Sequence, residues 1–181
     1  MNFYQEHHIA LKREIQRLLP IIQDQIYEFG NDETLEKIYT SVEKAYEVSG
    51  LSKKTSCSKG CSFCCYDKIL LSAIEQRTIS KKIKKYNKKL INKQNTKDFD
   101  SLKWVEKKCS LLDNQGNCTI YEDRPLICRT HNSTGEPEDC KITGKGHQQA
   151  YILEVEAMEV ALLASNQGEE MFLHELIYKL K

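Results

Sequence analysis

Eight cysteines, all between positions 57 and 140, constrain this chain of 181 residues more than any other feature. Four of them form the block Cys57-Ser-Lys-Gly-Cys61-Ser-Phe-Cys64-Cys65. Thiolates two to four residues apart can converge on one ion across a tight turn, and Gly60 supplies the backbone freedom that such a turn needs. Because the side chains of Cys64 and Cys65 diverge, we expect one of them to ligate a first centre and the other to meet a second centre or a distant cysteine.

The other four cysteines, Cys109, Cys118, Cys128 and Cys140, are spaced too widely for one turn, so the fold has to gather them. Cys109 and Cys118 bracket a predicted hairpin and can approach each other across it. Cys128 follows a predicted helix start, and His131 shares its face if that helix continues for one more turn. We therefore predict all eight cysteines as metal ligands. His131 is either a further ligand or an ordinary polar residue near a helix end.

Two arginines flank Cys128 in the sequence. Arg124 and Arg129 can donate hydrogen bonds to metal-bound thiolates or offset the negative charge of a cluster, without binding the metal themselves. The alternative is that each forms an ion pair with Glu122 or Asp123. The sequence leaves both interpretations open.

The chemistry of the donors favours particular metals. Sulfur ligands suit zinc, iron and iron–sulfur clusters, and they argue against magnesium and calcium. The N-terminus lacks a basic start followed by an apolar core, and no stretch approaches the roughly 18 apolar residues of a membrane span. We expect a cytoplasmic protein without a membrane segment, in which thiols bind metal rather than form disulfides. The eight thiols fill either two four-thiolate sites or one site with spare thiols.

Hydrophobic periodicity predicts a single, mainly α domain with a small β-hairpin beside a cysteine-rich core. We expect an N-terminal helical scaffold over 1–50, the cysteine core over 55–141 and C-terminal helices over 147–181. Apolar residues at steps of three and four mark the first two helices. Five further signals refine this prediction: Pro20 kinks or splits the first helix, Gly30 ends it, the second helix closes near Ser49-Gly50, the Ser72-to-Glu75 capping box starts another helix, and Gly116 turns a hairpin over 110–121.

A lysine-rich segment is the one strong charge feature in a chain with a net charge of +1. Residues 81–97 contain eight lysines and no arginine. Such a helix either binds nucleic acid or is an ordinary solvated surface. We favour the solvated surface, because arginine is the better bidentate partner of phosphates and bases.

The cysteine blocks also resemble a known family. The first block, together with Cys109-Ser-Leu-Leu-Asp113, Gly116-Asn-Cys118-Thr-Ile-Tyr121 and Arg124-Pro-Leu-Ile-Cys128-Arg129, is similar to the YkgJ-type cysteine cluster proteins, also called the CxxCxxCC family of zinc- or iron-chelating proteins. The resemblance covers roughly residues 55–131. The first gap holds three residues instead of the two in the family's shorthand name.

The resemblance implies metal chelation, with no settled activity for most members of the family. Flagellin lysine methylases resemble this group in their cysteine signature and are thought to hold an iron–sulfur cluster. That makes an iron–sulfur enzyme acting on a protein or peptide side chain our second hypothesis. A zinc-stabilised nucleic-acid-binding protein is the third. The sequence assigns no catalytic residue, and whether the protein is an enzyme stays open.

Overall fold

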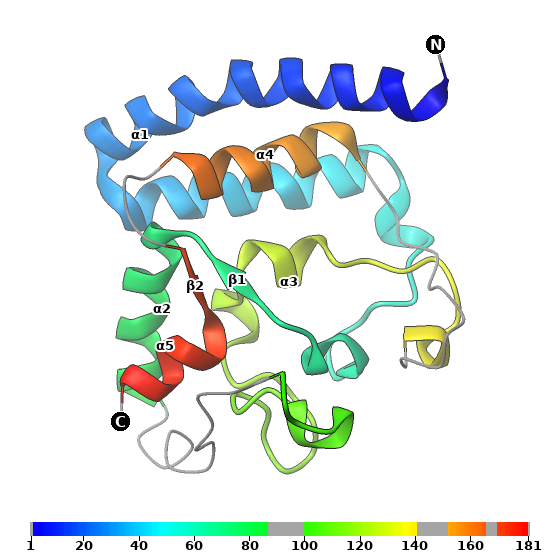
Figure 1. Ribbon diagram of the computed structural model, residues 1–181, viewed down its shortest axis with the longest axis vertical. Coiled ribbons are helices and arrows are strands. Elements are labelled where there is room, and N and C mark those ends of the chain that lie inside the picture. Colours follow the sequence, from blue (N-terminus) through cyan, green and yellow to red (C-terminus); the bar gives the residue numbers. More distant parts are fainter. Residues whose placement is uncertain (1, 87–99, 141–151, 166–169, 181) are drawn as a thin grey trace.

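The computed structural model describes residues 2–86, 100–140, 152–165 and 170–180 (Figure 1). Its helices are α1 (Phe3–Val48), α2 (Ala73–Tyr86), α3 (Leu126–Thr130), α4 (Leu153–Ala164) and α5 (Leu173–Lys179). Five short 3-10 helices complete them: η1 (Leu51–Lys53), η2 (Phe63–Tyr66), η3 (Trp104–Lys107), η4 (Tyr121–Asp123) and η5 (Pro137–Cys140). The predicted mainly helical class is confirmed.

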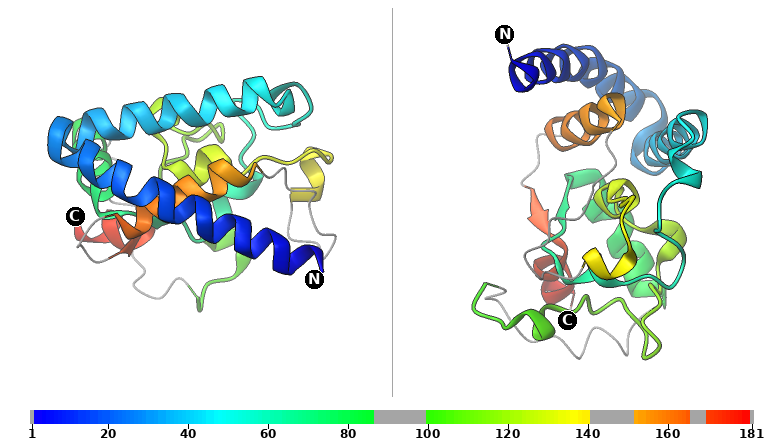
Figure 2. Two further views of the ribbon diagram at one scale, coloured as in Figure 1. Left: turned by 90° about the horizontal axis from the view of Figure 1, so that it is seen from above. Right: turned by 90° about the vertical axis from the view of Figure 1, so that its right-hand side faces the viewer.

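Helix α1 consists of two helical segments that meet at Gly30. Gly30 has φ 78° and ψ 178°, a conformation that only glycine adopts easily, and the chain reverses there (Figure 2). The break predicted at this glycine is therefore confirmed. The predicted split at Pro20 is wrong, because Pro20 lies inside the helix and only Gly30 leaves helical dihedral angles. Leu18 and Ile22 are both buried on either side of Pro20, so packing holds this part of the helix together.

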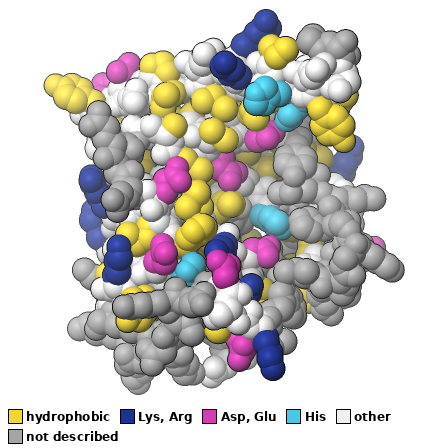
Figure 3. Space-filling model, in the orientation of Figure 1, with side chains coloured by type: hydrophobic (Ala, Val, Ile, Leu, Met, Phe, Trp, Pro, Cys, Tyr) yellow, Lys and Arg dark blue, Asp and Glu magenta, His cyan; other side chains and the backbone are white. Residues whose placement is uncertain are grey.

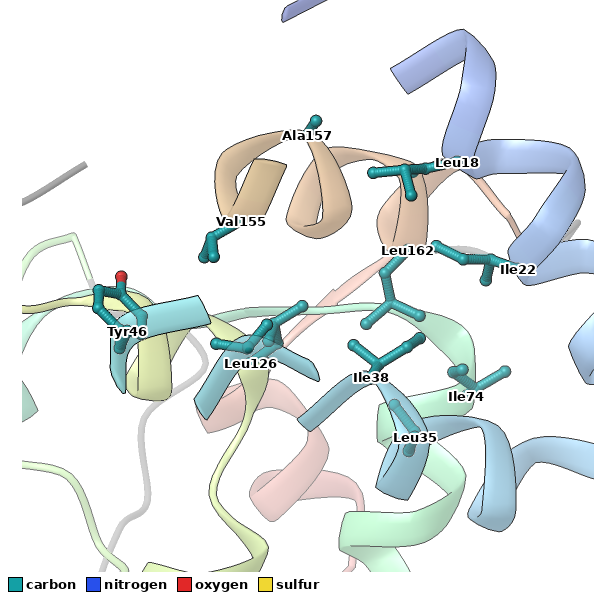
Figure 4. Close-up of a cluster of buried hydrophobic side chains, with 12 residues drawn as sticks. Leu18, Ile22, Leu35, Ile38, Tyr46, Ile74, Leu126, Val155, Ala157 and Leu162 are labelled. Atoms are coloured by element: carbon teal, nitrogen blue, oxygen red, sulfur yellow. The ribbon is translucent and has the colours of Figure 1, made fainter. Parts of the chain in front are cut away.

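The upper layer of the molecule is formed by α1 and α4. Both halves of α1 contribute to one hydrophobic cluster: Leu18 and Ile22 come from the first half, and Leu35, Ile38, Val42 and Tyr46 from the second. Helix α4 packs between them through Val155, Ala157, Ala161 and Leu162 (Figure 4). Ile74 of α2 and Leu126 of α3 join the same cluster, so this core ties the helical layer to the cysteine-bearing segments below it.

A second hydrophobic cluster supports the lower part of the molecule. Its buried members come from β1, α2, α5 and the 109–120 segment: Leu71, Ile79, Ile83, Leu111, Ile120, Leu173, Leu176 and Ile177. Strand β1 (Leu70–Leu71) pairs antiparallel with β2 (Met171–Phe172), which joins residues about a hundred positions apart. Cys109 and Cys118 pack against this cluster, so it forms one wall of the cysteine-rich region.

The predicted hairpin over 110–121 is present in a reduced form. Its pairing consists of one antiparallel bridge between Leu112 and Cys118, and Gly116 adopts φ 85° in the turn. The carboxylate of Asp113 accepts hydrogen bonds from the backbone N–H groups of Gln115 and Asn117, both at 2.8 Å. Backbone hydrogen bonds from the Asp113 N–H to the Asn117 carbonyl oxygen and from the Thr119 N–H to the Leu111 carbonyl oxygen, both at 2.9 Å, flank the bridge.

The capping box that we predicted at the start of α2 is also present. The Oε2 atom of Glu75 accepts a hydrogen bond from the Ser72 backbone N–H at 3.0 Å, and the Glu75 N–H donates to Ser72 Oγ at 3.4 Å. Most of the predicted lysine-rich helix, residues 87–97, lies outside the described residues. Within the described parts of the chain, no helix combines the length and the apolarity that crossing a membrane requires.

Candidate metal centre

The first cysteine block folds into two tight turns. The Cys61 N–H donates to the Ser58 carbonyl oxygen at 3.0 Å, and Gly60 has φ 96° inside this turn, as its position between two cysteines predicted. Cys64 and Cys65 then lie in η2, where the Cys65 N–H donates to the Ser62 carbonyl oxygen at 3.0 Å. These short-range bonds bring thiols that are close in sequence to one side of the molecule.

A backbone hydrogen bond joins the two cysteine blocks directly. The Cys109 N–H donates to the Cys65 carbonyl oxygen at 2.7 Å. Cys118 faces Leu112 across the hairpin bridge, which brings it back near Cys109. Cys128 lies in the middle of α3, the short helix that follows Pro125. Three separate segments therefore bring their thiols to the place where η2 lies.

These segments enclose a cavity of about 300 Å³. Seven of the eight predicted ligands line it: Cys57, Cys61, Cys64, Cys65, Cys109, Cys118 and Cys128. His131, Arg124 and Arg129 line it as well. Cys140 is absent from the lining, but η5, which carries it, contacts η2, and its charge acts on Cys57. The structure thus brings seven predicted cysteines to one space and leaves the eighth at its border.

None of the eight cysteines, all of which lie in the described parts of the chain, forms a disulfide, and the surroundings keep most of them protonated. Burial raises the pKa of Cys109 to about 12, and nearby Cys118 and Cys64 add to the effect. A hydrogen bond between the Cys64 and Cys65 side chains, followed by burial, raises the pKa of Cys64. Burial also raises the pKa of Cys57, Cys118 and Cys128. Because thiolates repel one another in such a space, a bound cation is what would make several of them stable together.

The donors fit a soft metal ion by their chemistry. Sulfur from several segments around one cavity matches the preference of zinc and iron for thiolate. Among the described residues, however, no three His, Cys, Asp or Glu side chains converge closely enough to hold an ion. Holding a metal therefore requires the thiols around the cavity to come closer together than they lie here.

Comparison with known proteins bears directly on this arrangement. A family model described as "CxxCxxCC: Putative zinc- or iron-chelating domain" matches residues 56–157, more than half of the chain. The chain belongs to the CxxCxxCC family. This membership supports metal binding in general and confirms the resemblance seen in the cysteine blocks. Neither curated proteins nor solved structures gave a match.

Within this member of the CxxCxxCC family, Cys57 and His131 are linked at one edge of the cavity. The Cys57 Sγ atom lies 3.8 Å from the His131 carbonyl oxygen and 3.3 Å from the Ser133 N–H, which donates to it. Helix α3 ends at Thr130, so His131 is its C-cap and not part of another turn. His131 nevertheless lines the same cavity as Cys128. It keeps its place as a candidate ligand by this route instead of by helical spacing.

The two arginines have different surroundings. Arg124 donates to the Tyr121 carbonyl oxygen at 3.1 Å, stacks 4.0 Å above the Tyr121 ring, and its charge counteracts the burial that raises the pKa of Cys118. From this position Arg124 can offset negative charge at Cys118 without binding a metal itself. Arg129 is buried, and its guanidinium pairs with Glu43 at 2.6 Å and donates to the Arg124 and Glu122 carbonyl oxygens.

The ion pairs of Glu122 and Asp123 differ from the pairs with Arg124 and Arg129 that the sequence suggested. The Arg129 guanidinium pairs with Glu43 of α1, whereas Glu122 pairs with Lys59 and Asp123 with Lys82. Glu43 was not a candidate in the sequence because it lies 86 positions away from Arg129. Arg129 therefore ties the helix that carries Cys128 to the helical layer.

Sequence reasoning missed one buried carboxylate beside the site. Glu75 is 2% exposed, and its charge acts on Cys128. The capping-box pattern identified Glu75 as the cap of α2 but contained no sign of its contact with α3. Tyr39, whose pKa is raised mainly by burial and then by Glu75, lies next to it and was missed for the same reason.

Proposed function

We propose that this protein binds zinc or iron through the thiolates of its C-x3-C-x2-C-C block and its downstream cysteines. The observation that carries the proposal is the cavity itself, because seven thiols from three separate segments line it. Magnesium and calcium prefer oxygen ligands, so a cavity lined by this many sulfur donors does not suit them. Membership of a family described as zinc- or iron-chelating supports the same conclusion.

In this proposal the residues have distinct roles. The seven cavity cysteines supply the ligands, with His131 as a possible nitrogen donor at the edge and Cys140 as an eighth thiol at the border. Arg124 offsets the negative charge of the thiolates near Cys118. We place the protein in the cytoplasm, where thiols stay reduced and available for a metal.

An iron–sulfur enzyme acting on a protein or peptide side chain is the second candidate. The volume of the cavity favours it, because about 300 Å³ greatly exceeds the roughly 30 Å³ share of one water molecule and leaves room for a polynuclear cluster. One iron–sulfur cluster is held by four cysteine thiolates, so the seven thiols of the cavity are more than enough to hold one. When bound, such a cluster would supply redox or radical chemistry.

Nucleic-acid binding is the weakest candidate. Of the lysines predicted to form a basic face, Lys81 pairs with Asp32 and Lys82 with Asp123, both at 2.9 Å. On the face seen in Figure 3, basic and acidic side chains are intermixed. The two ion pairs favour an ordinary solvated surface for the part of this helix that the structure describes.

Elemental analysis of anaerobically purified protein tests the proposal. We expect zinc or iron bound in a fixed ratio to the chain, and a loss of that metal in Cys128→Ser. Ser58→Ala is the matched control, because Ser58 lines the same cavity without a thiol, and it should keep the metal. Iron with acid-labile sulfide would select the iron–sulfur candidate. Parent protein that contains neither metal, and takes up neither after reduction, would refute metal binding.

A further inference from the structure

Glu75 forms more hydrogen bonds than a helix cap requires. Its Oε2 atom accepts from the Ser72 N–H at 3.0 Å and from the Ser72 hydroxyl at 2.8 Å. Its Oε1 atom accepts from the backbone N–H of Leu126 at 2.7 Å and from the Tyr39 hydroxyl at 3.5 Å. One buried carboxylate thus connects α2, the first turn of α3 and α1.

Burying a carboxylate is costly unless its oxygens are hydrogen-bonded, so this position needs a structural reason. Capping α2 does not provide one, because the capping-box bonds are local and do not require the glutamate to be buried. The bond to Leu126 does provide one. The first N–H groups of a helix have no partner within the helix, and α3 is too short to be stable without tertiary contacts.

Helix α3 is held at its other end as well. Arg129 pairs with Glu43 of α1, and the Tyr46 hydroxyl donates to the Thr130 carbonyl oxygen at 3.0 Å. These contacts fix the C-terminal part of α3, whereas the Glu75 bond fixes its N-terminal part. Cys128 lies between the two attachments and lines the cavity. The orientation of its thiol therefore depends on both.

We infer that Glu75 is a positioning residue, which holds α3 so that Cys128 presents its thiol to the metal centre. The inference rests on the proposed metal binding. The negative charge of Glu75 adds to the rise in the pKa of Cys128, so it does not favour the thiolate form of this residue. What Glu75 supplies is the direct bond to the backbone of α3.

Titration of the reduced, metal-free full chain with cobalt(II) tests the inference, because cobalt reports thiolate ligands through its charge-transfer and ligand-field absorption. In Glu75→Ala we expect cobalt affinity about 10- to 100-fold below the parent, as for other outer-shell partners. We also expect a ligand-field spectrum that indicates one thiolate fewer. The matched control is Ser72→Ala, which alters the same capping box but leaves the Glu75–Leu126 bond. It should bind cobalt like the parent.

Each alternative result has a defined meaning. Equal cobalt affinity and spectra in Glu75→Ala and the parent would overturn the positioning role. Equal losses in Glu75→Ala and Ser72→Ala would reduce Glu75 to a cap of α2 and would also overturn it. If Glu75→Ala does not fold, as judged by the loss of helical circular dichroism, Glu75→Asp is used in its place. Its carboxylate is one methylene shorter, so it keeps the cap of α2 but does not reach the Leu126 N–H. Cobalt binding like that of the parent in Glu75→Asp would contradict the inference. A parent without any thiolate–cobalt band would refute metal binding itself.

Discussion

Metal binding by this protein should be strongly dependent on pH. Because the pKa of Cys109 is about 12 and burial raises the pKa of Cys57, Cys118 and Cys128, these thiols hold their protons at pH 7. Each thiol that ligates an ion must release its proton first. Affinity should therefore rise about tenfold per pH unit for each ligating thiol between roughly pH 6 and 8, which is about 1.4 kcal/mol per thiol. A four-thiolate site would gain about 5.5 kcal/mol per pH unit.

Two measurements on the reduced protein check this slope. Zinc affinity is obtained by competition with a chelator at several pH values, and protons released per zinc are counted with an indicator dye in weak buffer. We expect about four protons per zinc, or three if the neutral imidazole of His131 replaces one thiol. At zinc concentrations high enough to load the weakened site of Cys128→Ser, this variant should release one proton fewer per bound zinc than the parent. An affinity that does not change between pH 6 and 8 would refute the argument that protonated, buried thiols form the site.

Two further predictions concern the scaffold. Leu35 is 1% exposed in the upper hydrophobic cluster, so Leu35→Ala should lower the free energy of unfolding in urea by about 2–5 kcal/mol. Tyr27→Ala, at a position that is 94% exposed, should change it by less than about 0.5 kcal/mol, and a similar loss in both variants would contradict the described core. Gly30→Ala should cost about 1–3 kcal/mol through backbone strain alone, since a Cβ there meets no atom within 4 Å. Gly50→Asn is its control because asparagine tolerates the left-handed conformation of Gly50; thermal unfolding that shows no loss in Gly30→Ala would disprove the strain.

Local signals in the sequence predicted much of the helical scaffold. Gly30 and the Ser72-to-Glu75 box were readable because a left-handed glycine and a capping pair depend on a few neighbouring residues. Pro20 was predicted to kink or split the helix, and the split is wrong because proline was weighed against local helix stability alone. The contacts of Leu18 and Ile22 with the rest of the core are tertiary, and they keep the helix continuous there.

The candidate site was predictable in composition and less so in geometry. The number and spacing of the cysteines indicated that they come together in the fold. Seven of the eight line one cavity. What the sequence lacked was the set of long-range bonds that place them. The bonds from Leu126 to Glu75 and from Arg129 to Glu43 span 51 and 86 positions, and the pairing of β1 with β2 joins the middle of the chain to residues 171–172. No local pattern specifies such partners.

The pairing of β1 with β2 also orders events during synthesis of the protein. Leu173, Leu176 and Ile177 complete the hydrophobic wall on which Cys109 and Cys118 rest, and they leave the ribosome after every cysteine has emerged. Until then the hydrophobic cluster beside Cys109 and Cys118 is incomplete, and these thiols are accessible to oxidants and to other metal ions. If the proposed metal binding is correct, loading of the site should follow the docking of α5, and a nascent chain halted before that point would carry its cysteine thiols without this hydrophobic wall.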